Sequence, residues 1–139
     1  MSVQLVLEVS AEIGNLGPLL DKLDAFGERH SWSAEAMYHV RLVVEEMLIN
    51  VIDYGGVPGL PLPWVKLDLQ QSACLLQIKL SDDGVAFNPL AQPTPDLSLS
   101  LEDRPIGGLG VHFLRTFKES VHYQRDGCWN HLSFSKQVC

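Results

Sequence analysis

Glu46 and Asn50 are the first two side chains along the chain whose types and spacing suit chemistry. On a helix they lie one turn apart on one face, and Asp53 follows on the same face. The carboxylate can accept a proton from an attacking hydroxyl or water, and the carboxamide oxygen can help to hold Mg²⁺, which prefers oxygen ligands. The solvated polar edge of an amphipathic helix has the same pattern, and for this pair alone we favour that alternative.

A second candidate site follows a strand-like run at Asp82, with Gly84 two residues later. An acid at a strand end can accept a hydrogen bond from an exocyclic amine such as that of adenine, and glycine lets a base approach closely. Phe87 either forms a wall of such a pocket or ends the strand. An ordinary Asp-Gly turn explains the same residues, so this motif alone indicates little.

A third group is rich in glycine and precedes an apolar helical run. Backbone N–H groups at the start of a helix can bind phosphate oxygens, and the side chains of Arg104 and Arg115 can add positive charge. In isolation, a flexible loop that joins a helix is nearly as good an explanation. The residues of this group are Gly107, Gly108, Leu109 and Gly110.

The chain has 139 residues, which predicts a single domain over residues 1–139. Its formal net charge of −7 and its ten scattered Lys and Arg residues argue against direct nucleic-acid binding. The N-terminal residues lack the features of a signal peptide, and no run is long and apolar enough to cross a bilayer. Three widely spaced cysteines, Cys74, Cys128 and Cys139, are typical of small core or surface residues in a reducing cytosol. We therefore expect a cytoplasmic protein.

Hydrophobic periodicity predicts the elements that would position these groups. Gly27 is expected to end the first helix and Ser33 to cap the second, while Asp126-Gly127 and a short link at 71–73 are expected to be hairpin turns. A long loop is expected at 88–105. The predicted strands are 3–9, 65–70, 74–80, 121–124 and 129–134, and the predicted helices are 13–26, 34–54 and 108–118.

This order of elements predicts the fold class. It is an α+β fold, a two-layer α/β sandwich in which a mixed, mostly antiparallel sheet carries helices on one face. Taken together, the end of the second helix, the strand end at Asp82 and the glycine-rich group predict a nucleotide pocket.

The three motifs in this order resemble those of the GHKL ATPase superfamily, which has the histidine kinase-like, or Bergerat, fold. The chain is most similar to the small bacterial anti-sigma factor serine/threonine kinases, above all in the runs 83–89 and 104–112. The resemblance implies ATP or ADP and Mg²⁺ as cofactors. As partners it implies an anti-sigma factor antagonist, a STAS-like domain, and a sigma factor or analogous regulator, and it allows a homodimer.

By motif, the resemblance makes Glu46 the catalytic glutamate, Asn50 the Mg²⁺-binding asparagine and Asp82 the adenine-reading aspartate. The stretch 88–106 would be the lid over ATP. Ala86 stands where the superfamily has a second glycine, and Tyr54 where many kinases have a histidine. Further residues expected at the nucleotide are Asp53, Gly84, Phe87, Arg104, Gly107, Gly108, Leu109 and Gly110.

The resemblance implies an enzyme that uses ATP to phosphorylate a serine or threonine on the antagonist, and so regulates a sigma factor by partner switching. The alternative is an ATP-gated regulatory module that binds a partner with little or no kinase activity. A structural domain with a degenerate pocket remains only if no nucleotide binds.

Overall fold

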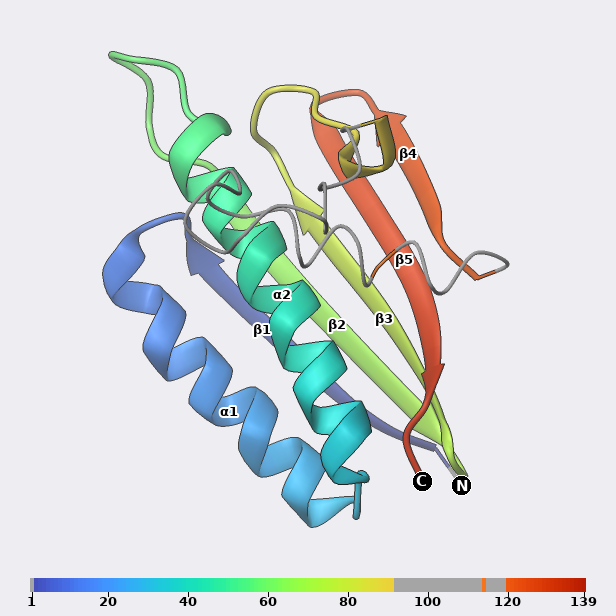
Figure 1. Ribbon diagram of the computed structural model, residues 1–139. Coiled ribbons are helices and arrows are strands. Elements are labelled where there is room, and N and C mark those ends of the chain that lie inside the picture. The colour runs from blue at the N-terminus through green and yellow to red at the C-terminus, as the bar shows by residue number, and fades with distance from the viewer. Residues whose placement is uncertain (1, 92–113, 115–119) are drawn as a thin grey trace, which may run out of the picture.

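The computed structural model describes residues 2–91, 114 and 120–139, and shows a five-stranded sheet with two long helices on one face (Figure 1). The predicted two-layer α+β sandwich is confirmed. Both termini lie at one end of the sheet, and the last turn of α2 lies at the other (Figure 1). The strands are β1 (Ser2–Ser10), β2 (Trp64–Ser72), β3 (Leu75–Asp82), β4 (His122–Asp126) and β5 (Trp129–Gln137); the helices are η1 (Ile13–Asn15), α1 (Leu16–Arg29), α2 (Ala34–Tyr54) and η2 (Pro89–Ala91).

The strand order is β1-β2-β3-β5-β4, and all four pairings between these strands are antiparallel. The expectation of a mixed sheet is therefore wrong for the part of the chain that the structure describes. Alternation within the strands separates a core face from a polar face, as in β2, where Val65, Leu67 and Leu69 are buried between more exposed neighbours. The sheet thus has one apolar face for the helices to cover.

Helix α2 begins where the sequence predicts, because the Ser33 hydroxyl accepts a hydrogen bond of 3.1 Å from the Ala36 amide. Helix α1 differs from the prediction, since it runs through Gly27 to Arg29. Gly27 is buried, and a Cβ added there would lie 2.7 Å from the ring of Trp32. The glycine therefore serves close packing of an aromatic side chain rather than the end of the helix.

The two hairpin turns lie one to two residues from their predicted positions. The β2–β3 turn is at Ala73 and Cys74, because Gln71 continues β2 and accepts a hydrogen bond of 2.7 Å from the Trp32 indole. Ala73 takes the left-handed backbone (φ 53°) that a tight hairpin requires. The predicted helix 108–118, and the predicted loop beyond Ala91, lie outside the described residues, apart from the helical Leu114.

The prediction for the cysteines is also corrected. Cys74 and Cys139 form a disulfide with their Cα atoms 5.1 Å apart, and Cys128 is an exposed free thiol. The bridge ties the β2–β3 turn to the C-terminal residues, and the Val138 amide donates to the Cys74 carbonyl at 2.8 Å. The two cysteines are far apart in the sequence, so their spacing did not predict the pair. They meet because the antiparallel pairing of β3 with β5 places Leu75 opposite Gln137. Among the described residues, no helix is long and apolar enough to span a membrane.

Replacement of one bridged cysteine is expected to destabilise the fold. Cys139→Ser opens a loop with a sequence separation of 65 residues, which should lower the free energy of unfolding by about 2–4 kcal/mol. Urea denaturation of non-reduced protein measures this loss. Cys128→Ser is the matched control, and an equal loss in both variants would contradict a structural role for the bridge.

Candidate functional site

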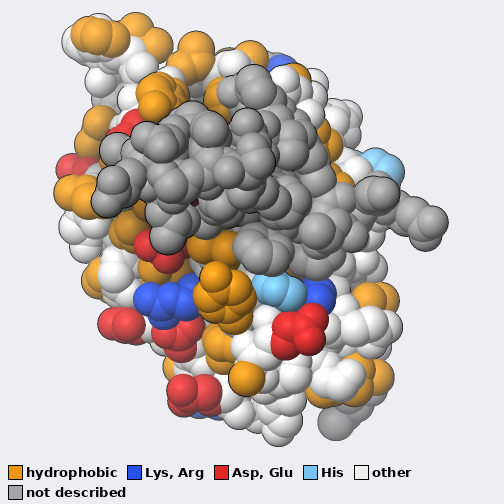
Figure 2. All heavy atoms as spheres, viewed as in Figure 1, with side chains coloured by type: hydrophobic (Ala, Val, Ile, Leu, Met, Phe, Trp, Pro, Cys, Tyr) orange, Lys and Arg blue, Asp and Glu red, His pale blue; other side chains and the backbone are white. Residues whose placement is uncertain are grey.

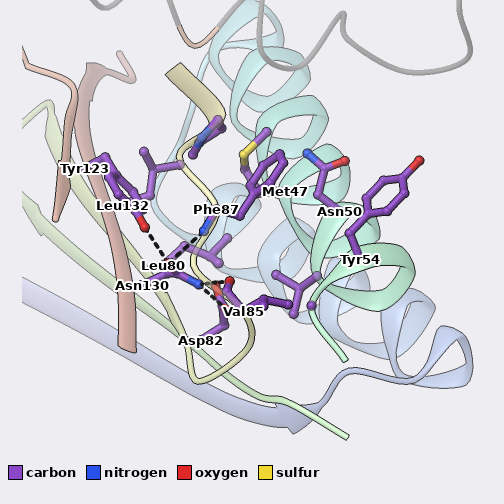
Figure 3. A pocket seen from close by; sticks show the side chains of 13 residues that line it. Met47, Asn50, Tyr54, Leu80, Asp82, Val85, Phe87, Tyr123, Asn130 and Leu132 are labelled. Atoms are coloured by element: carbon purple, nitrogen blue, oxygen red, sulfur yellow. Dashed lines mark hydrogen bonds between the residues drawn. The ribbon is translucent and has the colours of Figure 1, made fainter. Parts of the chain in front are cut away.

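A pocket lies between the C-terminal half of α2 and the ends of β3, β4 and β5 (Figure 3). Its helix side is formed by Met47, Asn50, Val51 and Tyr54, which share one face at helical spacing. The other side combines apolar and polar groups from three strands and the segment after β3. These are Leu80, Asp82, Val85, Phe87, Pro89, Tyr123, Asn130 and Leu132, and Gly55 completes the lining.

Asp82 is the buried acid of this pocket, with only 7% of its surface exposed. Its Oδ1 atom accepts two hydrogen bonds, from the Asn130 side chain at 2.9 Å and from the Gly84 amide at 3.0 Å. Both bonds end on Oδ1. As far as the described residues show, Oδ2 is therefore the carboxylate oxygen that can accept from a donor in the pocket. The carboxylate is thus held in one orientation, as a group that recognises a ligand amine must be.

Asn130 holds together the polar part of the pocket (Figure 3). Besides Asp82, its amide nitrogen donates to the Val85 carbonyl at 2.9 Å, and its oxygen accepts from the Tyr123 hydroxyl at 2.5 Å and the Phe87 amide at 3.2 Å. All four hydrogen-bonding positions of the carboxamide are therefore used. Because Val85 and Phe87 are fixed through their backbones, Asn130 positions the wall of the pocket as well as its acid.

Burial raises the pKa of the Asp82 carboxyl above its ordinary value. The hydrogen bonds from Asn130 and Gly84 oppose this rise, as does the positive charge of Arg125. Arg125 is held near the site because its guanidinium donates to the Gly84 carbonyl at 2.8 Å. The carboxylate is therefore costly to keep charged, which is typical of a group that serves binding rather than stability.

Gly84 allows the strand end and the helix end to meet. A Cβ at this position would lie 2.8 Å from the Gly55 carbonyl oxygen and 3.1 Å from Asp82 Oδ1. The Val85 amide also donates to the Gly55 carbonyl at 2.9 Å. Any side chain at residue 84 would push α2 away from β3 and disturb the acid at the same time.

The structure brings three of the predicted site residues, Asn50, Asp82 and Phe87, to one pocket. Glu46 lies one turn before Asn50 on α2 and is half-buried, whereas Asp53 is exposed and is not part of the described lining. Gly84 is not part of the described lining, but its amide donates to Asp82 in the pocket. Arg104, Arg115 and the predicted phosphate-binding group Gly107, Gly108, Leu109 and Gly110 lie outside the described residues.

Sequence reasoning missed Asn130 and Tyr123. A signal for Asn130 was present, because the strand alternation places it on the same face as the core residues Leu132 and Phe134. A carboxamide at a core position needs partners, and this is the position where a polar network should have been sought. Tyr123 gave no such signal in the sequence. Its hydroxyl finds its acceptor, Asn130, only through the pairing of β4 with β5.

Asp82→Asn is expected to stabilise the unliganded protein at neutral pH. The folded state raises the pKa of this carboxyl, so its contribution to stability is present below the unfolded pKa and is lost as the pH rises through the folded pKa. Asparagine keeps an oxygen for the two donors and removes the buried charge. Thermal unfolding from pH 4 to pH 8 tests this, and a variant that is less stable than wild type at pH 7 would contradict it.

Asn130→Ala is expected to raise the pKa of Asp82 further, because one of the groups that lowers it is removed. If the Asp82 carboxylate accepts from adenine, ATP affinity should then begin to fall at a higher pH than in wild type as the solution is acidified. Calorimetric ATP titration at several pH values measures this shift. Tyr123→Phe is the control, because it removes one hydrogen bond to Asn130 and leaves the hydrogen bonds to Asp82 in place. An equal shift of the pH dependence in both variants would contradict the conclusion that the Asn130 side chain lowers the pKa of Asp82.

Comparisons with known proteins show the family to which the chain belongs. The model of the histidine kinase-like ATPase domain family matches residues 9–136. The chain is 31% identical over 129 residues to the serine/threonine-protein kinase BtrW of Bordetella bronchiseptica, covering 93% of this chain and 90% of the relative. The fold is also similar, with a TM-score of 0.68 at 7% identity, to a crystal structure of the RsbU and RsbW domains of Rv1364c from Mycobacterium tuberculosis. That match covers 98% of this chain and 32% of the other. The predicted family is confirmed: the chain belongs to the histidine kinase-like ATPase domain family, whose domain binds ATP or ADP.

Proposed function

We propose that this chain is an ATP-dependent serine/threonine protein kinase of the anti-sigma factor type. Its substrate would be a hydroxyl on an anti-sigma factor antagonist, a STAS-like domain, and its second partner a sigma factor or analogous regulator in the cytoplasm. The observation that carries the proposal is that Asn50 and Asp82 face one pocket from different layers of the fold. Similarity to a named serine/threonine kinase along almost the whole chain supports the type of reaction.

The adenine end of the nucleotide is assigned to Asp82. Its Oδ2 can accept a hydrogen bond from the exocyclic amine, because Oδ1 is occupied by Asn130 and the Gly84 amide. Apolar side chains from both layers, among them Met47 and Leu80, can contact the faces and edges of the flat ring. The pocket therefore offers the mixture of apolar walls and one oriented acceptor that a purine requires.

The phosphate end is assigned to Asn50, on the opposite side of the pocket (Figure 3). Its carboxamide suits Mg²⁺, which takes few protein ligands and keeps waters and phosphate oxygens around it. When bound, Mg²⁺ would neutralise charge that develops on the phosphates. We also assign to the phosphates the Arg104 side chain and the backbone of Gly107, Gly108, Leu109 and Gly110. Asp53 would contact the nucleotide from the edge of the pocket.

Glu46 is the proposed base. It lies one helical turn from Asn50, so a hydroxyl beside the terminal phosphate would be within reach of its carboxylate. Glu46 would accept the hydroxyl proton as that oxygen attacks the terminal phosphorus, while the bond to the leaving oxygen of ADP breaks. Because α2 fixes both residues on one face, the distance between the Glu46 carboxylate and the Asn50 carboxamide does not depend on a flexible loop.

Glu46→Gln is expected to reduce phosphoryl transfer at least about a hundredfold, since the amide cannot accept the proton. ATP affinity should change little, because the variant keeps the shape of the side chain. The assay follows the labelled terminal phosphate of ATP into the antagonist domain encoded nearest to this chain's gene, and calorimetry measures ATP binding.

Asn50→Ala is the comparison variant, and it should lose Mg²⁺-dependent ATP binding. Unchanged transfer in Glu46→Gln would remove Glu46 from the mechanism. ATP-dependent affinity for the antagonist without any phosphorylated product, in the wild type, would instead favour an ATP-gated binding module.

A further inference from the structure

An apolar loop projects from the pocket end of the molecule, between α2 and β2 (Figure 1). Figure 2 shows hydrophobic side chains gathered on this corner. Among the described residues, eleven large hydrophobic side chains are exposed, and four of them fall within this short stretch. They are Tyr54 (67% exposed), Leu60 (64%), Leu62 (51%) and Val57 (46%). We call residues 54–63, which carry these four side chains, the rim loop.

The rim loop carries no charge, although the chain has 17 acidic residues and a net charge of −7. Residues 54–63 are Tyr, Gly, Val, Pro and Leu only. A contiguous exposed apolar surface of this kind marks an interaction site in a soluble protein. Because the loop projects outward rather than forming a cavity, it suits contact with a macromolecular surface and not with a small molecule.

The loop is also preformed. Pro63 is buried at its end, and the Pro63 carbonyl accepts from the Ala11 amide at 2.8 Å. A turn joins the Leu60 amide to the Val57 carbonyl at 3.1 Å, with Gly59 in the left-handed region (φ 84°). Pro58 and Pro61 restrict the remaining backbone. Binding through such a segment loses little conformational entropy.

The start of the rim loop is also a wall of the pocket, because Tyr54 and Gly55 belong to the pocket lining. Glu46 lies eight residues before Tyr54 on the same helix, about 12 Å along its axis, so a folded protein whose hydroxyl reaches Glu46 can extend to the rim loop. Contacts away from the reacting hydroxyl are where a kinase gains discrimination between protein substrates. An uncharged apolar loop supplies such contacts without adding repulsion to a charged nucleotide.

We propose that the rim loop is the docking surface for the phosphoacceptor protein. The partner would be a folded domain with an uncharged apolar patch beside an exposed serine or threonine. This inference rests on the proposed kinase function, since it takes the acceptor to be a protein that approaches the pocket rim.

The test compares Leu60→Ser/Leu62→Ser with the matched control Val3→Ser/Tyr38→Ser, which removes two exposed apolar side chains elsewhere. Val3 lies at the far end of β1, opposite Gln71, and Tyr38 lies in the first turns of α2. The probe is the antagonist domain encoded nearest to this chain's gene. The loop variant should raise the KM and the Kd for this domain by about tenfold or more, with kcat and ATP affinity changed less than about twofold; the control should match wild type.

Unchanged KM and Kd in the loop variant, or an equal loss in the control, would overturn the docking proposal. It would also be overturned if the variant altered only self-association in sedimentation, because the occupant would then be a second copy of the chain. If the wild type bound the domain without phosphorylating it, the kinase function would fail while the Kd comparison still decided the role of the loop. A wild type that neither bound nor phosphorylated the domain would overturn the proposed partner.

Discussion

The pocket depends on the close approach of two backbones, at Gly55 after the end of α2 and at Gly84 after the end of β3. The distance between the helix layer and the sheet at this point is set by the hydrogen bond from the Val85 amide to the Gly55 carbonyl and by the absence of a side chain at residue 84. Asn50 is carried by one of these backbones and Asp82 by the other. Their separation is therefore a property of the main chain, which makes the pocket insensitive to rotamer changes at its surface.

The second constraint is electrostatic. A carboxylate that is largely withdrawn from water raises the energy of the folded protein, and Asn130, the Gly84 amide and Arg125 offset only part of this cost, since the pKa of Asp82 stays raised. Such a residue lowers stability in the absence of a ligand, and under the proposed function it gains a partner when adenine binds. A destabilising group that takes part in binding is a common arrangement at functional sites.

The sequence was most informative where local signals acted alone. Ser33 has the side chain of an N-cap and serves as one, and hydrophobic periodicity predicted the bounds of β2 and β3 to within two residues. Prediction failed where distant segments decide the outcome. Gly27 has the composition of a helix end but lies under Trp32, and Cys74 meets Cys139 only through the register of β3 with β5. Asp82 could be proposed from its place after a strand, whereas the partners that orient it come from β5 and could not.

The position of β5 in the sheet has a consequence for how the chain folds. This strand is the nearest to the C-terminus, yet it lies between β3 and β4, and it pairs with β3 from Leu75–Gln137 to Asp82–Asn130. Its insertion joins segments that are far apart in the sequence, which is a slow step in folding. A nascent chain that has not yet released these residues from the ribosome exposes the open edge of β3 and lacks Asn130. The complete five-stranded sheet and the polar wall of the pocket can therefore form only after the residues of β5 have been synthesised.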